Sequence, residues 1–258
     1  MRQYRLTSPD FYSRFATRLT KLLGCLILSV FVSQASAADD KSKLTFTTSS
    51  EKARALFEQG LAKYDRARLK EATPFFQQAI EADPQFALGH LFRGLAGDSV
   101  PHIRKATEMV AHVSEPERLL ILSWGAQADS KTLKAIELME GAVKLLPADA
   151  RLRTRLAQLY GATNRRAEAV AELKRAIASE PKFAPAFNQL GQIHVAAGEF
   201  AEALAAREAY ARLLPDEAEP YQAIAHTYQQ MQQFDKAVEY YTRPQDRSRL
   251  HQCLPPSR

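Results

Sequence analysis

Small and apolar residues return along most of the chain at intervals of three and four, and polar residues fill the positions between them. The segment EAVAELKRAIASEP (168–181) shows this pattern, with Ala169, Leu173 and Ala176 on one face. The spacing is that of a helix with one buried face, because a helix completes a turn in about 3.6 residues. The chain is therefore predicted to fold into short amphipathic helices.

The helical pattern repeats with a fixed period. A shift of 34 residues places Pro181, which ends this segment, on Pro215, and the reverse shift places it on Pro147. Alanines fall in phase under the same shift, as Ala135 and Ala169 show. A period of this length indicates stacked copies of one small unit and not a single globular fold.

The first unit carries a recognisable motif. Its two helices read Leu56-x2-Gln59-Gly60 and Ala72-x3-Phe76-x2-Ala79-x4-Pro84. This pattern resembles the tetratricopeptide repeat, whose signature is W-x2-L-G-x2-Y, then A-x3-F, then P. The resemblance implies an all-α fold, a right-handed superhelical solenoid of antiparallel helix hairpins.

Five such units and a partial sixth are predicted over residues 51–243. Their approximate bounds are 51–85, 86–115, 116–149, 150–183, 184–217 and 218–243. The second unit fits least well, because Pro116 arrives earlier than the period requires, and the turn that ends this unit is expected to be shortened. The pattern stops after Thr242, so residues 244–258 are predicted to form a disordered tail, either native or an altered ending.

Residues 1–37 have the composition of a secretory signal. Basic residues up to Lys21 precede the apolar run 22–32, and Ala35-Ser36-Ala37 supplies the small residues of a cleavage site. Export to the periplasm or cell envelope follows as an expectation. Residues 38–50 are small and polar and are predicted to be a flexible linker.

Two alternatives concern this leader. It could be retained as an anchor, but its apolar run has only about half of the roughly 20 residues that a spanning helix needs, so no integral membrane span is expected in the mature chain. It could be lipidated at Cys25, since Leu22-Leu23-Gly24-Cys25 loosely resembles a lipobox. That cysteine opens the apolar run instead of closing it, which favours the cleaved signal.

The charge and cysteine content limit the partners. The formal net charge is +6, and removal of residues 1–37 takes away five basic residues and Asp10, which leaves about +2. Most of the basic excess therefore belongs to the leader and gives no support for binding to nucleic acid. The mature chain keeps only Cys253 and can form no internal disulfide.

The sequence contains no recognised catalytic or metal-binding motif. H-E-x-x-H, G-x-S-x-G, a phosphate-binding G-x-x-x-x-G-K loop and paired-cysteine spacings are all absent. The six histidines are scattered singly: His90, His102, His112, His194, His226 and His251. No cofactor, no metal and no enzymatic activity are predicted, although His251 and Cys253 lie close together in the tail.

The family resemblance implies a surface instead of an active site. In such arrays the first helices of successive hairpins line a concave groove that receives an extended peptide or a partner helix. Transferring that register places the following residues in the groove: Trp124, Arg151, Arg155, Gln158, Asn188, Gln192, Gln222 and His226.

Two of these residues could recognise an acidic group. Arg151 and Arg155 are one turn apart, so both guanidinium groups can face one carboxylate. This resembles part of the carboxylate clamp of chaperone-binding members, but Leu91 and Trp124 stand where such a clamp has lysine and asparagine. The alternative is a solvated face with partners on the same helix. For Trp124 the alternative to a groove anchor is core packing.

The function expected from these patterns is that of an exported scaffold that binds another protein or a peptide through its groove. A regulatory or accessory subunit of an envelope enzyme complex is the alternative. An enzyme in its own right would need catalytic groups on helix faces that packing occupies. The oligomeric state and the partner are not specified by the sequence.

Overall fold

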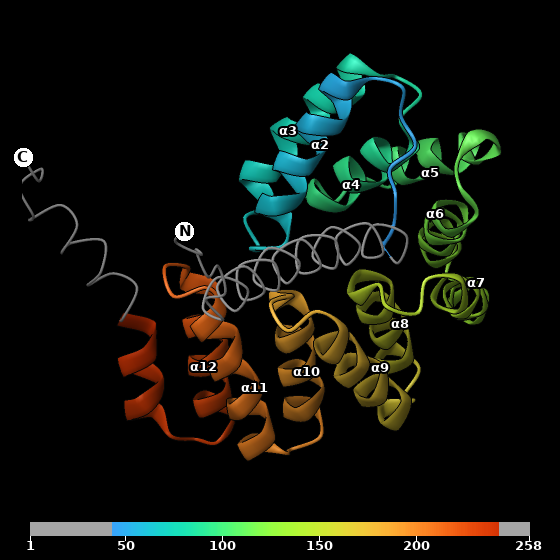
Figure 1. The fold of residues 1–258 in the computed structure, drawn as a ribbon. Coiled ribbons are helices and arrows are strands. Elements are labelled where there is room, and N and C mark those ends of the chain that lie inside the picture. The colour runs from blue at the N-terminus through green and yellow to red at the C-terminus, as the bar shows by residue number, and fades with distance from the viewer. Residues whose placement is uncertain (1–42, 243–258) are drawn as a thin grey trace, which may run out of the picture. The chain divides into compact units, whose positions relative to one another are not determined.

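The computed structural model describes residues 43–242, and every regular element within that range is helical. Figure 1 shows the helices following one another as antiparallel pairs. Eleven α-helices carry labels, and their bounds are α2 (Glu51–Tyr64), α3 (Leu69–Ala82), α4 (Ala87–Ala96), α5 (Val100–Glu108), α6 (Glu115–Ala128), α7 (Thr132–Leu145), α8 (Ala150–Ala162), α9 (Arg166–Ser179), α10 (Ala184–Ala196), α11 (Phe200–Leu213) and α12 (Ala218–Gln230).

The pairing of these helices confirms the predicted repeat array. Helices α2 and α3 form the first hairpin, and the pairs α4–α5, α6–α7, α8–α9 and α10–α11 form the next four. Helix α12 is followed by a last helical segment, residues 234–242, which completes a sixth hairpin. The signal segment 1–37 and the tail 244–258 lie outside the described residues.

The turn within each hairpin has the same backbone geometry. One residue in each turn has a positive φ, and five of the six are not glycine: Ala67, Asp98, Ser130, Asn164, Gly198 and Gln232. The last four are each 34 positions apart, so the turn repeats in register with the helices. A left-handed residue ends the first helix and reverses the chain.

The second hairpin departs from the others in a way the sequence only partly indicated. Helices α4 and α5 have 10 and 9 residues, and the 3₁₀ turn Val110–His112 precedes α6. The expected shortening therefore falls on the helices, with Gly97 following α4 and Pro101 in the first turn of α5. The two helices approach closely, since a Cβ on Gly94 would lie 2.8 Å from Ile103.

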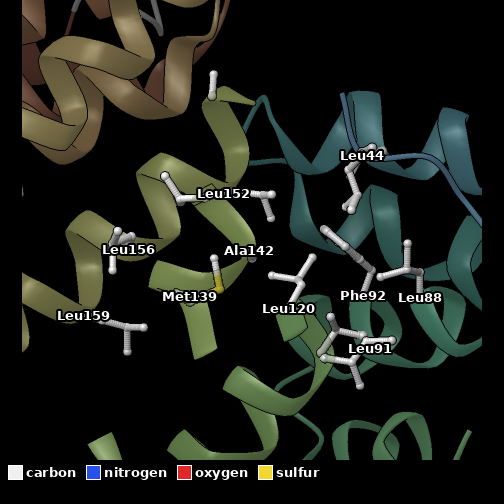
Figure 2. Packing of buried hydrophobic residues seen from close by; sticks show 14 of the residues in the cluster. Leu44, Leu88, Leu91, Phe92, Leu120, Met139, Ala142, Leu152, Leu156 and Leu159 are labelled. Atoms are coloured by element: carbon white, nitrogen blue, oxygen red, sulfur yellow. The ribbon is translucent and has the colours of Figure 1, made fainter. Parts of the chain in front are cut away.

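Small residues allow close helix contact, and aromatic rings fill the spaces between hairpins. A Cβ on Gly60 would lie 2.7 Å from the ring of Phe76, so only glycine fits there. Phe57 is fully buried, and the rings of Phe46, Phe86 and Phe92 lie within 5.3 Å of it. The core continues through α6, α7 and α8, where Figure 2 shows Leu120, Met139, Leu152, Leu156 and Leu159.

The segment that precedes α2 is packed against the array. We call residues 44–50 the N-terminal strap; it is the blue trace that leads into α2 in Figure 1. Leu44 is buried in the same core cluster as Leu88 and Phe92 (Figure 2), and the ring of Phe46 meets Phe57 at 4.9 Å. Residues 44–50 therefore differ from the predicted flexible linker, because Leu44 and Phe46 pack into the core and Thr47 and Thr48 donate hydrogen bonds to carboxylates.

Acidic side chains near the starts of three first helices hold the strap. The Leu44 amide donates to Asp149 at 2.8 Å, and the Thr48 hydroxyl donates to Asp83 at 2.5 Å. Between them, both the amide and the hydroxyl of Thr47 donate to Glu117. Asp83, Glu117 and Asp149 precede or begin α4, α6 and α8, so the strap joins the second, third and fourth hairpins to the first.

Glu117 gives a test of the strap. Its carboxylate is fully buried and also completes a capping box with Ser114. Glu117→Ala leaves the donors of Thr47 and Ser114 without an acceptor, so we expect the free energy of unfolding to fall by about 2 to 4 kcal/mol. Urea unfolding measures this change, and Glu115→Ala is the matched control, since Glu115 is exposed and pairs only with Arg118. Equal small losses in both variants would show that the strap adds no stability.

Candidate functional site

A pocket lies among the first helices of consecutive hairpins. Its free volume is about 80 Å³, which is room for one side chain or a terminal group and not for a helix. Helices α2, α4, α6, α8 and the start of α10 all contribute to its wall. First helices therefore line a small pocket on this stretch of the array, and the groove for an extended peptide or a helix stays a prediction.

Most of the pocket wall is apolar. Aromatic rings come from four hairpins, and leucines and a proline fill the space between them: Tyr64, Phe92, Leu95, Leu120, Trp124, Phe183 and Pro185. Phe92 and Leu120 are buried and belong to the core, so the wall is held by the packing of the array. A ligand that enters the pocket would remove these apolar surfaces from contact with water, which favours binding.

Arg151 lines the pocket but already has a carboxylate partner. Its two terminal nitrogens donate to the two oxygens of Asp65 at 2.6 and 2.7 Å, and its guanidinium lies 5.2 Å from the ring of Phe183. Burial opposes the charge of Arg151, but the Asp65 carboxylate outweighs it and raises the pKa of Arg151 above its usual value. Arg151 is therefore paired in the free protein, and its partner lies in another hairpin and not on the same helix.

Arg155 lies one turn further along α8 and has no carboxylate partner among the described residues. Its guanidinium carbon sits 3.3 Å from the centroid of the Trp124 ring, and one terminal nitrogen donates to Gln127. The residue is only 6% exposed. This burial lowers the pKa of Arg155 to about 9, so the charged form is held at a cost in folding free energy.

Two polar atoms beside the pocket have no hydrogen-bond partner. They are the Nε of Arg155 and the hydroxyl of Thr154, and both side chains belong to buried residues that line the pocket. A buried donor without an acceptor costs about 1 to 3 kcal/mol. A cation, an aromatic face and unpaired donors in one recess make a site that an anionic group with an apolar neighbour would complete.

The eight residues predicted for the groove divide into two sets of four. Trp124, Arg151, Arg155 and Gln158 line the pocket together. The other four, which are Asn188, Gln192, Gln222 and His226, do not line it. Asn188 donates to Glu219 at 3.0 Å, and Gln192, Gln222 and His226 are exposed. Where α10 begins, Phe183 and Pro185 supply the wall of the pocket instead.

Sequence reasoning missed Asp65 and Phe183. Asp65 follows α2 and reaches Arg151 across 86 positions of sequence, and no local spacing pairs residues so far apart. Phe183 precedes α10 and looked like an ordinary link between two units. An aspartate at the turn after a first helix was the only available signal, and by itself it reads as a turn residue.

A second buried arginine gives a useful comparison. Arg207 belongs to α11 and is 4% exposed, and its Nε also lacks a partner. It donates to the Ala223 carbonyl and the Thr227 hydroxyl and does not line the pocket. Burial also lowers its pKa. Arg155 differs in facing a recess, where only the Gln127 side chain and the Trp124 ring meet its charge.

Residues 43–242 contain no group of three or more metal-ligating His, Cys, Asp or Glu side chains. Within the same range no helix has the length and apolar character to cross a bilayer. His90 and His102 face each other with their Nδ1 atoms 3.4 Å apart, and His90 also contacts the Pro84 carbonyl.

Comparisons with known proteins agree with the repeat. Two family models, both described as tetratricopeptide repeat, match residues 126–193 in one case and residues 53–86 and 218–243 in the other. No curated protein sequence matches the chain.

Solved structures show a similar fold. The crystal structure of the APC/C hetero-tetramer Cut9–Hcn1 is 18% identical, with a TM-score of 0.50 over 74% of this chain and 39% of that chain. The crystal structure of MamA is 21% identical, with a TM-score of 0.47 over 76% of this chain and 97% of that one. That of PilW, a type IV pilus biogenesis factor, is 16% identical, with a TM-score of 0.48 over 80% and 96%.

The cost of burying Arg155 can be measured directly. Arg155→Met keeps the length of the side chain and removes the charge, so we expect the free energy of unfolding in urea at pH 7 to rise by about 1 to 3 kcal/mol. Arg207→Met is the matched variant, and it should gain less because it gives up two hydrogen bonds. A clear loss of stability in Arg155→Met would mean that the charge serves the fold and not a ligand.

Proposed function

Because this chain is a tetratricopeptide repeat protein, we propose that it is an exported scaffold that holds a segment of another protein in the pocket around Arg155. The segment presents a carboxylate to Arg155 and an apolar group to the aromatic wall. The carboxylate belongs either to an acidic side chain or to the end of a chain. One anchor of this kind fits the size of the pocket.

The observation that carries the proposal is the buried, uncompensated charge of Arg155. A guanidinium that is 6% exposed loses most of its hydration, yet neither a carboxylate nor a full set of acceptors replaces it. An incoming carboxylate would accept charge-assisted hydrogen bonds from it, which are about twice as strong as neutral ones. An acceptor on the ligand would satisfy donors that the free protein leaves unpaired, and the free energy gained would add to the affinity.

The wall of the pocket supports a ligand with an apolar part. Trp124, Phe92 and Phe183 come from three different hairpins, so the rings are held at fixed positions before any ligand arrives. A preformed site loses little conformational entropy on binding. Aromatic and arginine side chains at the centre of a contact are also the residue types that contribute most to protein–protein affinity.

The groups in the pocket suit binding better than chemistry. The polar groups of the lining are two guanidinium groups, a carboxylate paired with one of them, the hydroxyls of Tyr64 and Thr154, the Gln158 amide and the Trp124 indole N–H. Arginine stays protonated and gives no base, and the Asp65 carboxylate is engaged by Arg151. The tetratricopeptide repeat is a scaffold type of fold, which is consistent with a site that holds a partner.

Export is part of the proposal and rests on the leader. The basic head, the apolar run 22–32 and Ala35-Ser36-Ala37 have the order of a secretory signal. We expect fractionation of the native cells to place the protein in the periplasm or cell envelope, with an N-terminus near Ala38 by mass spectrometry. A cytoplasmic protein that keeps residues 1–37 would contradict this part, and it would leave the pocket proposal standing.

The pocket proposal has a direct binding test. Trp124 is the one tryptophan of the chain and lies against Arg155, so its fluorescence reports occupancy. We expect acetyl-Gly-Ala-Leu with a free carboxylate to change this fluorescence in a saturable way. The carboxamide of the same peptide should bind about tenfold more weakly or worse, because it loses the charge-assisted bonds.

Two variants control this titration. Arg155→Met should weaken the carboxylate peptide by about tenfold or more, whereas Arg207→Met removes an equally buried arginine outside the pocket and should leave the affinity unchanged. Equal binding of acid and amide, or of wild type and Arg155→Met, would overturn the proposal. If the carboxylate peptide does bind through Arg155, crosslinking in the envelope followed by mass spectrometry would identify the natural partner.

A further inference from the structure

The turn between α2 and α3 forms one side of the pocket. We call residues 65–68 the closing turn. Asp65 holds Arg151 of α8, while Arg66 and Arg68 donate to Glu217 at 2.7 and 2.8 Å. Glu217 is buried and immediately precedes α12. The first hairpin is thus tied by its closing turn to the fourth and sixth hairpins, through two separate sets of ion pairs.

We propose that Asp65 is an internal competitor for the negative charge of the ligand. Its carboxylate occupies the fork of Arg151, which faces the same pocket as Arg155. The pocket therefore offers one arginine to a ligand, although it is built with two. This inference rests on the proposed function, and it assigns to Asp65 the role of setting how many acidic groups the pocket accepts and how tightly.

The geometry favours competition over a purely structural pair. Arg151 and Arg155 lie one helical turn apart, where side chains on one face are about 5 to 6 Å from each other. Both oxygens of Asp65 are engaged, in the bidentate arrangement that a ligand carboxylate would also use. A ligand with two adjacent acidic groups could therefore replace Asp65 at Arg151 while its other group meets Arg155.

The partial exposure of the pair allows such an exchange. The side chains of Arg151 and Asp65 are 23% and 26% exposed, and both residues line the pocket. The charge of Asp65 also offsets that of Arg151 for any anion approaching Arg155. Removing the charge of Asp65 leaves the charge of Arg151 uncompensated beside the pocket, which is enough to alter the affinity for an anion by about tenfold or more at the effective dielectric of a partly buried site.

The ion pairs of Glu217 allow the effect of the Asp65 charge to be separated from the effect of a loosened turn. Glu217 holds the same closing turn but does not line the pocket. Glu217→Gln therefore weakens the hold on the turn without changing the charge around Arg155. Asp65→Asn keeps the shape of the side chain and removes its charge beside Arg151.

The experiment titrates acetyl-Gly-Ala-Leu carboxylate into four proteins and follows the fluorescence of Trp124. The proteins are the wild type, Asp65→Asn, the double variant Asp65→Asn with Arg151→Gln, and Glu217→Gln, each confirmed as helical by circular dichroism. We expect Asp65→Asn to bind about tenfold more tightly. The double variant should lose most of that gain, and Glu217→Gln should show no gain over the wild type. The gain should shrink as salt is added.

The outcomes distinguish this inference from the function on which it rests. Wild-type binding that depends on Arg155 but is unchanged in Asp65→Asn would overturn the competitor role alone. An equal gain in Asp65→Asn and Glu217→Gln would also overturn it, because loosening of the turn would then be the cause. A lack of fluorescence response in every protein would overturn the proposed function and this inference with it.

Discussion

The structure depends on polar contacts that the beginning of the described chain makes with the starts of distant helices. The strap donates to Asp83, Glu117 and Asp149, and the closing turn donates to Glu217. A repeat array normally gains its stability only from neighbouring units. Here carboxylates near the starts of α4, α6, α8 and α12 also bind the first hairpin and its strap, so units far apart in sequence are joined.

These long-range contacts place the pocket as well as stabilise the array. Tyr64 and Asp65 reach Trp124 and Arg155 only because the first hairpin is held against the fourth. The pocket is therefore a property of the assembled array and not of any single repeat. Its small volume follows from the same contacts, because the closing turn takes space that an open groove would leave to a partner.

The sequence was sufficient for the repeat and insufficient for its closure. Alanines such as Ala135 and Ala169 return in phase because each sits where two helices touch, and that constraint is local enough to read from spacing. The same register correctly brought Trp124 and Arg155 into one recess. It could not identify the partner of Arg151, because Asp65 lies in a different hairpin. Nor could it show that residues 44–50 donate to carboxylates of three later helices, since their composition is that of an ordinary linker.

The central claim is that the first hairpin stays bound to the sixth in the free protein. Spin labels at the exposed positions 67 and 216, in a chain whose own cysteines are changed to serine, report this contact by pulsed electron resonance. The account predicts a single narrow distribution at short distance, which broadens and lengthens when Glu217 is changed to glutamine. A broad distribution reaching long distances in the otherwise unaltered protein would contradict it.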